Sequence, residues 1–411
     1  MSTKDRQLYQ ERDRRYVNTV RLQKADRVPT SFALSNFPAR LTGIPISTAF
    51  YDFPKWKEAF LKAALYVHPD RCSFFPNQSG IVLEIMQSKT AVWPHHGVDA
   101  NRPYQFVEGE YMLPQEYDHF LRDQSDFNIR VLFPRHFGLM EPLGKLPPLT
   151  TLPNNINYPA IADEEFVNML EKLVRASREA VEWQKKGQEL FDELNALGFP
   201  GKLPFSVGGV PFDQISDFLR GMKGAMLDMY RCPDKLMAAC ENIMGQVLQR
   251  IEDSPRPQEY AQTFIALHRG ADGFMSLKQF EKFYWPFLKK MVESLVAIGQ
   301  TPDIFFEGDY TQRLDYLQEF PRGKVLARFD RSDMAQVAKK LGGKICIAGG
   351  MPSSLLQTGT VEEVKKYAAW LIDTCAKDGG YVMASGSSLD EVNPENLQAL
   401  SDFTAEYGRY N

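Results

Sequence analysis

The sequence predicts an α/β fold in which helices cover a parallel sheet, and a (β/α)8 TIM barrel fits it best. Apolar strands alternate with amphipathic helices about five times in the C-terminal half, with short connections. The strands are continuously apolar, as in a sheet buried on both faces. Nothing resembles a GxGxxG or P-loop pattern, which makes a nucleotide-binding fold less fitting. We therefore expect a single barrel over residues 1–411.

The N-terminal half supplies the first elements of this barrel. Strands are predicted at 28–34, 71–76 and 204–209, each a short and largely apolar run. Helices are predicted at 54–67 and 164–198, where apolar residues recur at spacings of three and four.

The C-terminal half carries the clearest alternation. Strands are predicted at 260–268, 303–307, 324–330, 344–350 and 381–387. Helices are predicted at 276–299, 311–320, 332–343, 360–380 and 393–408. Ser332, Thr360 and Asn393 are the expected N-caps, because their side-chain oxygens can accept hydrogen bonds from the first free backbone N–H groups.

A loop-rich insertion is predicted within the barrel at residues 94–160. This segment is rich in proline, aromatic residues and turns. A loop of this length in a compact domain usually has a function, such as a lid or a binding wall. A passive insertion and a dimer contact are the alternatives.

Composition excludes several functional classes. The net charge of −4 shows no basic excess, so we expect neither nucleic-acid nor anionic-membrane binding. No run of 18 apolar residues predicts a transmembrane helix, and the charged N-terminus lacks a signal-peptide core. The five cysteines never form a CxxC pair, which favours free thiols. A cytoplasmic protein is expected.

The first candidate site lies in the segment DIFFEGDY, residues 303–310. Its apolar run stops at Glu307, Gly308 and Asp309, which places two carboxylates at the end of a buried strand. Barrel enzymes use the C-terminal ends of their strands for binding and chemistry. Glu307 is therefore a candidate acid or metal ligand. Asp309 is a candidate substrate anchor, with helix capping near Thr311 as the alternative.

Other candidates also follow predicted strands. His268 ends the strand at 260–268 and is a candidate proton carrier or metal ligand beside Glu307. Arg328 and Asp330 share one strand face, so they either contact substrate or form a structural ion pair. Ser387 closes the last strand as a candidate substrate contact. The adjacent residues 95 and 96, both histidine, are interpreted as loop residues.

Several segments in the expected order resemble the uroporphyrinogen decarboxylase superfamily, a group of TIM barrels that includes the decarboxylase and cobamide-dependent methyltransferases. These segments are RRYVNTVRLQKADRVP near the N-terminus, GVPFDQISDFLRGMKGAMLDMYRCPDKL at 209–236, HRGADGFMSLKQFEKFYWPFLKKMV at 268–292, GGMPSSLLQTGTVEEVKKY at 349–367 and PENL at 394–397. The resemblance covers nearly the whole chain except residues 94–160.

Departures from the superfamily patterns narrow what the resemblance implies. The decarboxylase holds a polycarboxylate with an arginine-rich stretch, and here only Arg40 is a candidate for that role. Thiol-methylating relatives bind zinc through histidine and cysteines, and here Phe305, Glu307 and Ser387 take those positions. The methyl-ether demethylase methyltransferases are the relatives that the sequence fits best.

The resemblance thus implies a methyltransferase that moves a methyl group from a small donor, such as a methyl aryl ether, to a separate corrinoid protein. No cofactor of the chain itself is certain. Zinc held by His268 and Glu307 is one option, and a metal-free site with Glu307 as acid is the other. A decarboxylase and a catalytically idle barrel are the alternatives, and a homodimer is one option for assembly.

Overall fold

The computed structural model describes residues 2–73, 78–148, 163–201 and 206–410. At its centre lie seven short parallel strands, which form one sheet of five strands and one of two. These strands are β1 Ser31–Ala33, β2 Arg71–Ser73, β6 Gln262–Leu267, β7 Thr301–Phe306, β8 Leu326–Phe329, β9 Cys346–Gly349 and β10 Tyr381–Val382. Neighbours pair in the order β6, β7, β8, β9, β10, and β1 pairs with β2. A parallel bridge between Thr30 and Met383 joins β1 to β10. The predicted α/β class, with a parallel sheet covered by helices, is confirmed.

The predicted strand at 204–209 lies partly outside the described residues. In its described part, 206–209, the backbone has no strand pairing. Among the described residues, backbone pairing therefore connects the strands in the order β2, β1, β10, β9, β8, β7 and β6.

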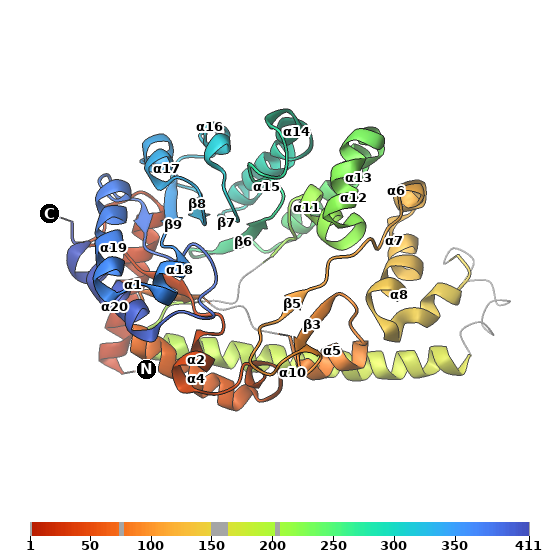
Figure 1. Ribbon diagram of the computed structural model, residues 1–411, viewed down its shortest axis with the longest axis horizontal. Helices are drawn as coiled ribbons and strands as arrows, with labels where there is room; N and C mark the ends of the chain where they lie inside the picture. The colour runs from red at the N-terminus through yellow and green to blue at the C-terminus, as the bar shows by residue number, and fades with distance from the viewer. Residues whose placement is uncertain (1, 74–77, 149–162, 202–205, 411) are drawn as a thin grey trace.

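Helices are present at every predicted range, and others that the sequence analysis did not predict lie between them. In the N-terminal half they are α1 Thr3–Val20, α2 Phe37–Thr42, α3 Thr48–Tyr51, α4 Phe53–Val67, α5 Gly80–Met86 and α10 Glu164–Ala196. Before β6 come α11 Pro211–Ile215, η6 Ser216–Arg220, α12 Gly221–Arg231 and α13 Pro233–Glu252. After β6 come α14 Leu277–Phe283, α15 Trp285–Ala297, η7 Thr311–Arg313, α16 Leu314–Leu317, α17 Met334–Leu341, α18 Ser353–Thr358, α19 Val361–Cys375 and α20 Pro394–Tyr407. Figure 1 shows α14 to α17 outside strands β6 to β9.

Two predicted helix details are corrected. The helix expected over 276–299 is broken at Tyr284, because Pro286 lacks the N–H that a continuous helix would use and its ring crowds the preceding turn. The N-cap of α17 is Asp333 and not Ser332. The Asp333 carboxylate accepts hydrogen bonds from the backbone N–H groups of Ala335 and Gln336, at 2.9 and 3.2 Å.

The mid-chain insertion contains more helix than the sequence suggested. It begins with a small sheet of β3 Ala91–Pro94, β4 Gly97–Val98 and β5 Gln105–Phe106. Short helical segments follow as η1 Pro114–Glu116, α6 Tyr117–Arg122, α7 Gln124–Phe127, η2 Asn128–Leu132, α8 Phe133–His136 and η3 Gly138–Lys145. Figure 1 shows α6 to α8 at the end of the molecule away from the C-terminus, and α10 reaches from α4 past α5 to contact η3.

Two groups of buried side chains hold the barrel together. The larger group lies between the strands and the surrounding helices. The smaller group joins Tyr16 and Val20 of α1 to Leu326, Cys346 and Ala348 on the alternate strand face. Because successive residues of a strand point to opposite faces, this smaller group fills the barrel interior, and α1 packs against it.

None of the helices in the described residues is both long and apolar enough to cross a lipid bilayer.

Candidate active site at the ends of β6 and β7

His268 and Glu307 face one another at neighbouring strand ends. His268 directly follows β6 and Glu307 directly follows β7. The preceding residues, Leu267 and Phe306, are partners in the parallel pairing of β6 and β7, so His268 and Glu307 lie side by side. The Nε2 atom of His268 lies 3.7 Å from Oε2 of Glu307. Gly308 has a φ of +92°, a left-handed conformation that glycine adopts easily, and this lets the chain turn immediately after Glu307.

Two aspartates from the helical segment before β6 hold His268 in place. Asp213 of α11 is buried, and it accepts hydrogen bonds from the backbone N–H groups of His268 and Arg269, at 3.1 and 2.9 Å. Tyr284 donates its hydroxyl proton to the same carboxylate at 2.6 Å. Asp217 of η6 lies 2.5 Å from Nδ1 of His268. The carboxylates therefore fix both the backbone and the ring of the histidine.

The local helix geometry explains how both aspartates reach the same residue. They are four positions apart, a spacing that places side chains on one face of a helix. The turn from Ser216 to Arg220 is a π-helix, a wider form that occurs frequently at functional sites. The sequence carried this signal as two aspartates in PFDQISDF, but the prediction did not include Asp213 or Asp217.

Charge interactions favour the protonated form of His268. The hydrogen bond with Asp217 is the largest effect and raises the pKa of the imidazole above 6.5, against the opposing effect of burial. The charges of Asp213, Asp217 and Glu307 raise this pKa further. Burial raises the pKa of Asp213 to about 6 and outweighs the lowering by His268 and by the Tyr284 hydrogen bond. The surrounding carboxylates thus stabilise a positive charge on the ring.

Arg269 connects this site to the mid-chain insertion. Its Nε donates to the Ser216 hydroxyl at 2.9 Å, and its Nη2 contacts carboxylate oxygens of Asp217 at 3.0 Å and Glu108 at 3.3 Å. Glu108 also accepts a hydrogen bond from the backbone N–H of Met222, at the start of α12. The insertion therefore contributes a side chain beside the histidine site.

Asp309 and Asp330 have local partners at the same end of the sheet. The Asp309 carboxylate accepts from the backbone N–H of Thr311 at 2.9 Å and from its hydroxyl at 2.6 Å, as the capping alternative predicted. The Asp330 carboxylate accepts from the N–H of Gly308 at 3.3 Å, and burial raises its pKa. Both residues therefore help to shape the turn that carries Glu307.

The ion pair expected on the β8 face forms with a different partner. Arg328 pairs with Asp303 of β7 at 2.5 Å, rather than with Asp330, and its Nη2 lies 3.3 Å from the Tyr16 hydroxyl. The register sets Arg328 opposite Phe305, so Asp303 is its diagonal neighbour on the same face. Arg328 therefore lies within the barrel, beside α1.

Arg40 lies in the last turn of α2 and Ser387 lies on a loop, and both residues are exposed. Arg40 donates to the carbonyl of Val392 at 3.1 Å, and the hydroxyl of Ser387 lies 2.9 Å from that of Ser353. In the part of the chain that the structure describes, no recorded contact joins either of them to His268 or Glu307.

The donor set at the site does not fit a catalytic zinc. His268 Nε2 and Glu307 Oε2 provide two ligands, whereas such a zinc uses three protein ligands and an open position. Among the described residues, no group of three or more histidine, cysteine, aspartate or glutamate side chains is arranged to hold a metal ion.

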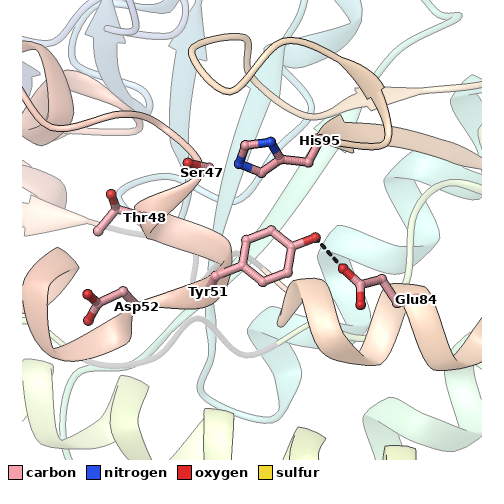
Figure 2. A pocket seen from close by; sticks show the side chains of 6 residues that line it. All are labelled: Ser47, Thr48, Tyr51, Asp52, Glu84 and His95. Atoms are coloured by element: carbon pink, nitrogen blue, oxygen red, sulfur yellow. Dashed lines mark hydrogen bonds between the residues drawn. The ribbon is translucent and has the colours of Figure 1, made fainter.

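Away from His268, a polar pocket of about 370 Å³ lies between α3, α5 and the turn after β3. Figure 2 shows its lining residues, with the Tyr51 hydroxyl donating to Glu84 at 2.7 Å. Burial raises the pKa of Tyr51 to about 12. His95 lines the pocket, whereas His96 bonds to Glu84 through Nε2 at 2.9 Å. Among the lining residues of this pocket, Tyr51 and Glu84 are joined by a hydrogen bond.

The site thus consists of a histidine between carboxylates at the strand ends of an α/β fold. Residues 202–407 match the model of the uroporphyrinogen decarboxylase (URO-D) family. This match spans half of the chain, so the chain belongs to that family, and the resemblance found in the sequence is confirmed. The family and the fold together support an enzyme of this superfamily.

Solved structures give a similar result for the fold. A methyltransferase from Methanosarcina mazei superposes with a TM-score of 0.59, over 96% of this chain and 98% of that one. The two sequences are 14% identical, so the likeness shows the fold alone. No curated protein matches the sequence.

Proposed function

We propose that the protein is a methyltransferase that moves a methyl group from a small donor, a methyl aryl ether or a similar compound, to a separate corrinoid protein. The observation that carries this proposal is the geometry of His268, whose Nδ1 lies 2.5 Å from Asp217 and whose Nε2 lies 3.7 Å from Glu307. The hydrogen bond with Asp217 raises the pKa of the imidazole and so favours its protonated form. The similarity of the fold to a methyltransferase supports the same reaction class.

The site residues supply the proton that the reaction needs. The bond between the methyl carbon and the donor oxygen breaks, its electron pair stays on the oxygen, and the methyl group passes to the nucleophilic acceptor on the corrinoid protein. His268 then gives its Nε2 proton to the oxygen, and the product leaves as a neutral alcohol or phenol. Asp217 keeps the Nδ1 proton in place, and Glu307 passes a proton from water back to Nε2.

An aromatic donor fits the side chains beside the site. Phe218 follows Asp217 directly and meets Phe106 of the insertion edge to face, with ring centroids 5.6 Å apart. These rings are 48% and 39% exposed, which leaves ring surface that an aromatic ligand could contact.

The charge balance argues against the decarboxylase alternative. Carboxylates of Asp217, Glu307 and Glu108 gather at the site, and the nearby arginine, Arg269, is already paired with two of them. A substrate with many carboxylates would be repelled here and would find no such arginine cluster as it needs.

Mixing the purified protein with a corrinoid protein in its reduced cobalt state tests the proposal. Methoxylated aromatics and methylamines are offered separately, and the cobalt absorption spectrum is followed. We expect methylation with at least one methoxylated aromatic. His268→Gln should abolish it, whereas His119→Gln should not, because His119 forms a comparable 2.7 Å pair with Asp126 in the insertion helices.

Two results would overturn the proposal. One is an unchanged cobalt spectrum with every donor, and release of carbon dioxide from a porphyrinogen would then establish the decarboxylase. The other is equal turnover by wild type and His268→Gln, which would remove the proton-donor role.

A further inference from the structure

The long helix α10 carries an exposed apolar stripe that the barrel does not use. The stripe consists of Val167, Leu170, Val174 and Val181, which are 43%, 44%, 49% and 50% exposed. Their spacings of three, four and seven residues repeat the first and fourth positions of a heptad, the pattern by which two helices pack along a shared seam. Single exposed apolar residues are ordinary, but a row of them in register indicates an interface.

The stripe faces away from the rest of the chain. The face of α10 that packs on the protein contains Phe166, Met169, Ala176 and Trp183. At 100° per residue, the stripe is centred roughly 130° around the helix from that buried face. Figure 1 shows α10 along one edge of the molecule, and the exposed fractions given above show that the stripe is open to solvent.

Charged residues flank the stripe with the same seven-residue spacing. Glu164 and Glu171 come first and Arg178 and Lys185 follow, and all four are exposed. Among the described residues, Glu171 and Arg178 form no ion pair within the chain, whereas Lys185 pairs with Glu182 of the same helix at 2.7 Å. The flank is therefore acidic at one end and basic at the other.

We propose that α10 is the contact surface for a second copy of this chain, with the two helices antiparallel. In that orientation Glu171 lies beside Arg178 of the second copy, and Glu164 lies beside Lys185. Each pair forms twice because a two-fold axis relates the copies. Val181 meets Leu170 of the second copy in the same register. A parallel pair would bring this charged flank against Phe166, Leu173 and Ala180, so the charges select the antiparallel form.

Sedimentation equilibrium of the full chain tests the contact. Wild type is expected at twice the mass of one chain at micromolar concentration. Leu170→Glu should give single chains, because a charge would then lie in the apolar seam. Leu65→Glu is the matched control, since Leu65 on α4 is 43% exposed and lies outside the stripe, and it should remain a dimer. Circular dichroism checks that each variant is folded.

Charge reversal tests the orientation. Glu171→Lys places like charges together twice and should weaken the dimer about tenfold. Adding Arg178→Glu restores opposite charges in an antiparallel pair, so the double variant should regain most of the affinity. A single-chain mass for wild type, a dimer of Leu170→Glu as tight as wild type, or a double variant weaker than Glu171→Lys would each overturn the proposal.

Discussion

Replacing Asp217 by asparagine is expected to move the pH dependence of turnover while leaving the His268 ring in place. Wild type needs protonated His268, whose pKa is raised above 6.5, chiefly by the hydrogen bond with Asp217. Activity should therefore be constant at low pH and fall as pH rises through that pKa. Asparagine removes the largest effect that raises this pKa, whereas burial, which lowers it, remains. The fall should then occur at lower pH.

The size of the effect follows from the 2.5 Å contact between Asp217 and Nδ1. A hydrogen bond to a charged group contributes about 1.5–3 kcal/mol, and a tenfold change in protonation corresponds to about 1.36 kcal/mol. The His268 side chain is 37% exposed and asparagine still offers an oxygen acceptor, so the lower end applies. Above the pKa of wild type, the protonated fraction and the rate should fall about tenfold.

The raised pKa of His268 also makes the free energy of unfolding depend on pH. A histidine whose pKa is raised by folding stabilises the protein most below its unfolded pKa, near 6.5, and this stabilisation is lost as pH rises through the folded pKa. Wild type should therefore have a higher free energy of unfolding than Asp217→Asn at pH 5, and this difference should be smaller at pH 9.

The measurement is methyl transfer from the best donor between pH 5 and pH 9, for wild type and Asp217→Asn. Asp118→Asn serves as the control, because it changes an exposed aspartate paired with Lys235 at 2.8 Å in the insertion. An alkaline limb at the same pH in Asp217→Asn and wild type would refute the assignment of His268 as the titrating acid.

Three further changes test other parts of the structure. Glu307→Gln should slow turnover about 100-fold without unfolding the protein, because proton return to the histidine is lost; unchanged turnover would contradict this role. Arg328→Met should destabilise the fold by about 3–5 kcal/mol in urea denaturation, because it leaves Asp303 charged in the barrel interior. A loss below about 1 kcal/mol would show that this ion pair is dispensable. Tyr284→Phe should cost about 1–3 kcal/mol in the same assay and raise the pKa of Asp213 further, since a hydrogen bond to the carboxylate is removed.

The order of strands and helices was predictable because it depends on local periodicity. The caps at Thr360 and Asn393 form as expected, since each oxygen lies within reach of a backbone N–H three or two residues later. The break at Tyr284 was visible in principle, because Pro286 interrupts an otherwise helical pattern.

Long-range partners were harder to predict. His268 and Glu307 could be placed together because adjacent parallel strands end at the same edge. Asp213 and Asp217 come from a helix some 50 residues earlier, and only the tertiary fold brings that helix beside β6. The pairing of Arg328 with Asp303 depends on the register between two strands, which the sequence alone does not specify.

The contact of Glu108 with Arg269 and with the start of α12 has a consequence for how the protein can be divided. Residues 202–407 contain the histidine and its three carboxylate neighbours, yet one acceptor of Arg269 comes from a segment outside that range. A chimera that transplants residues 202–407 onto the N-terminal half of another barrel would lose this acceptor. The minimal exchangeable unit therefore includes the loop that carries Glu108.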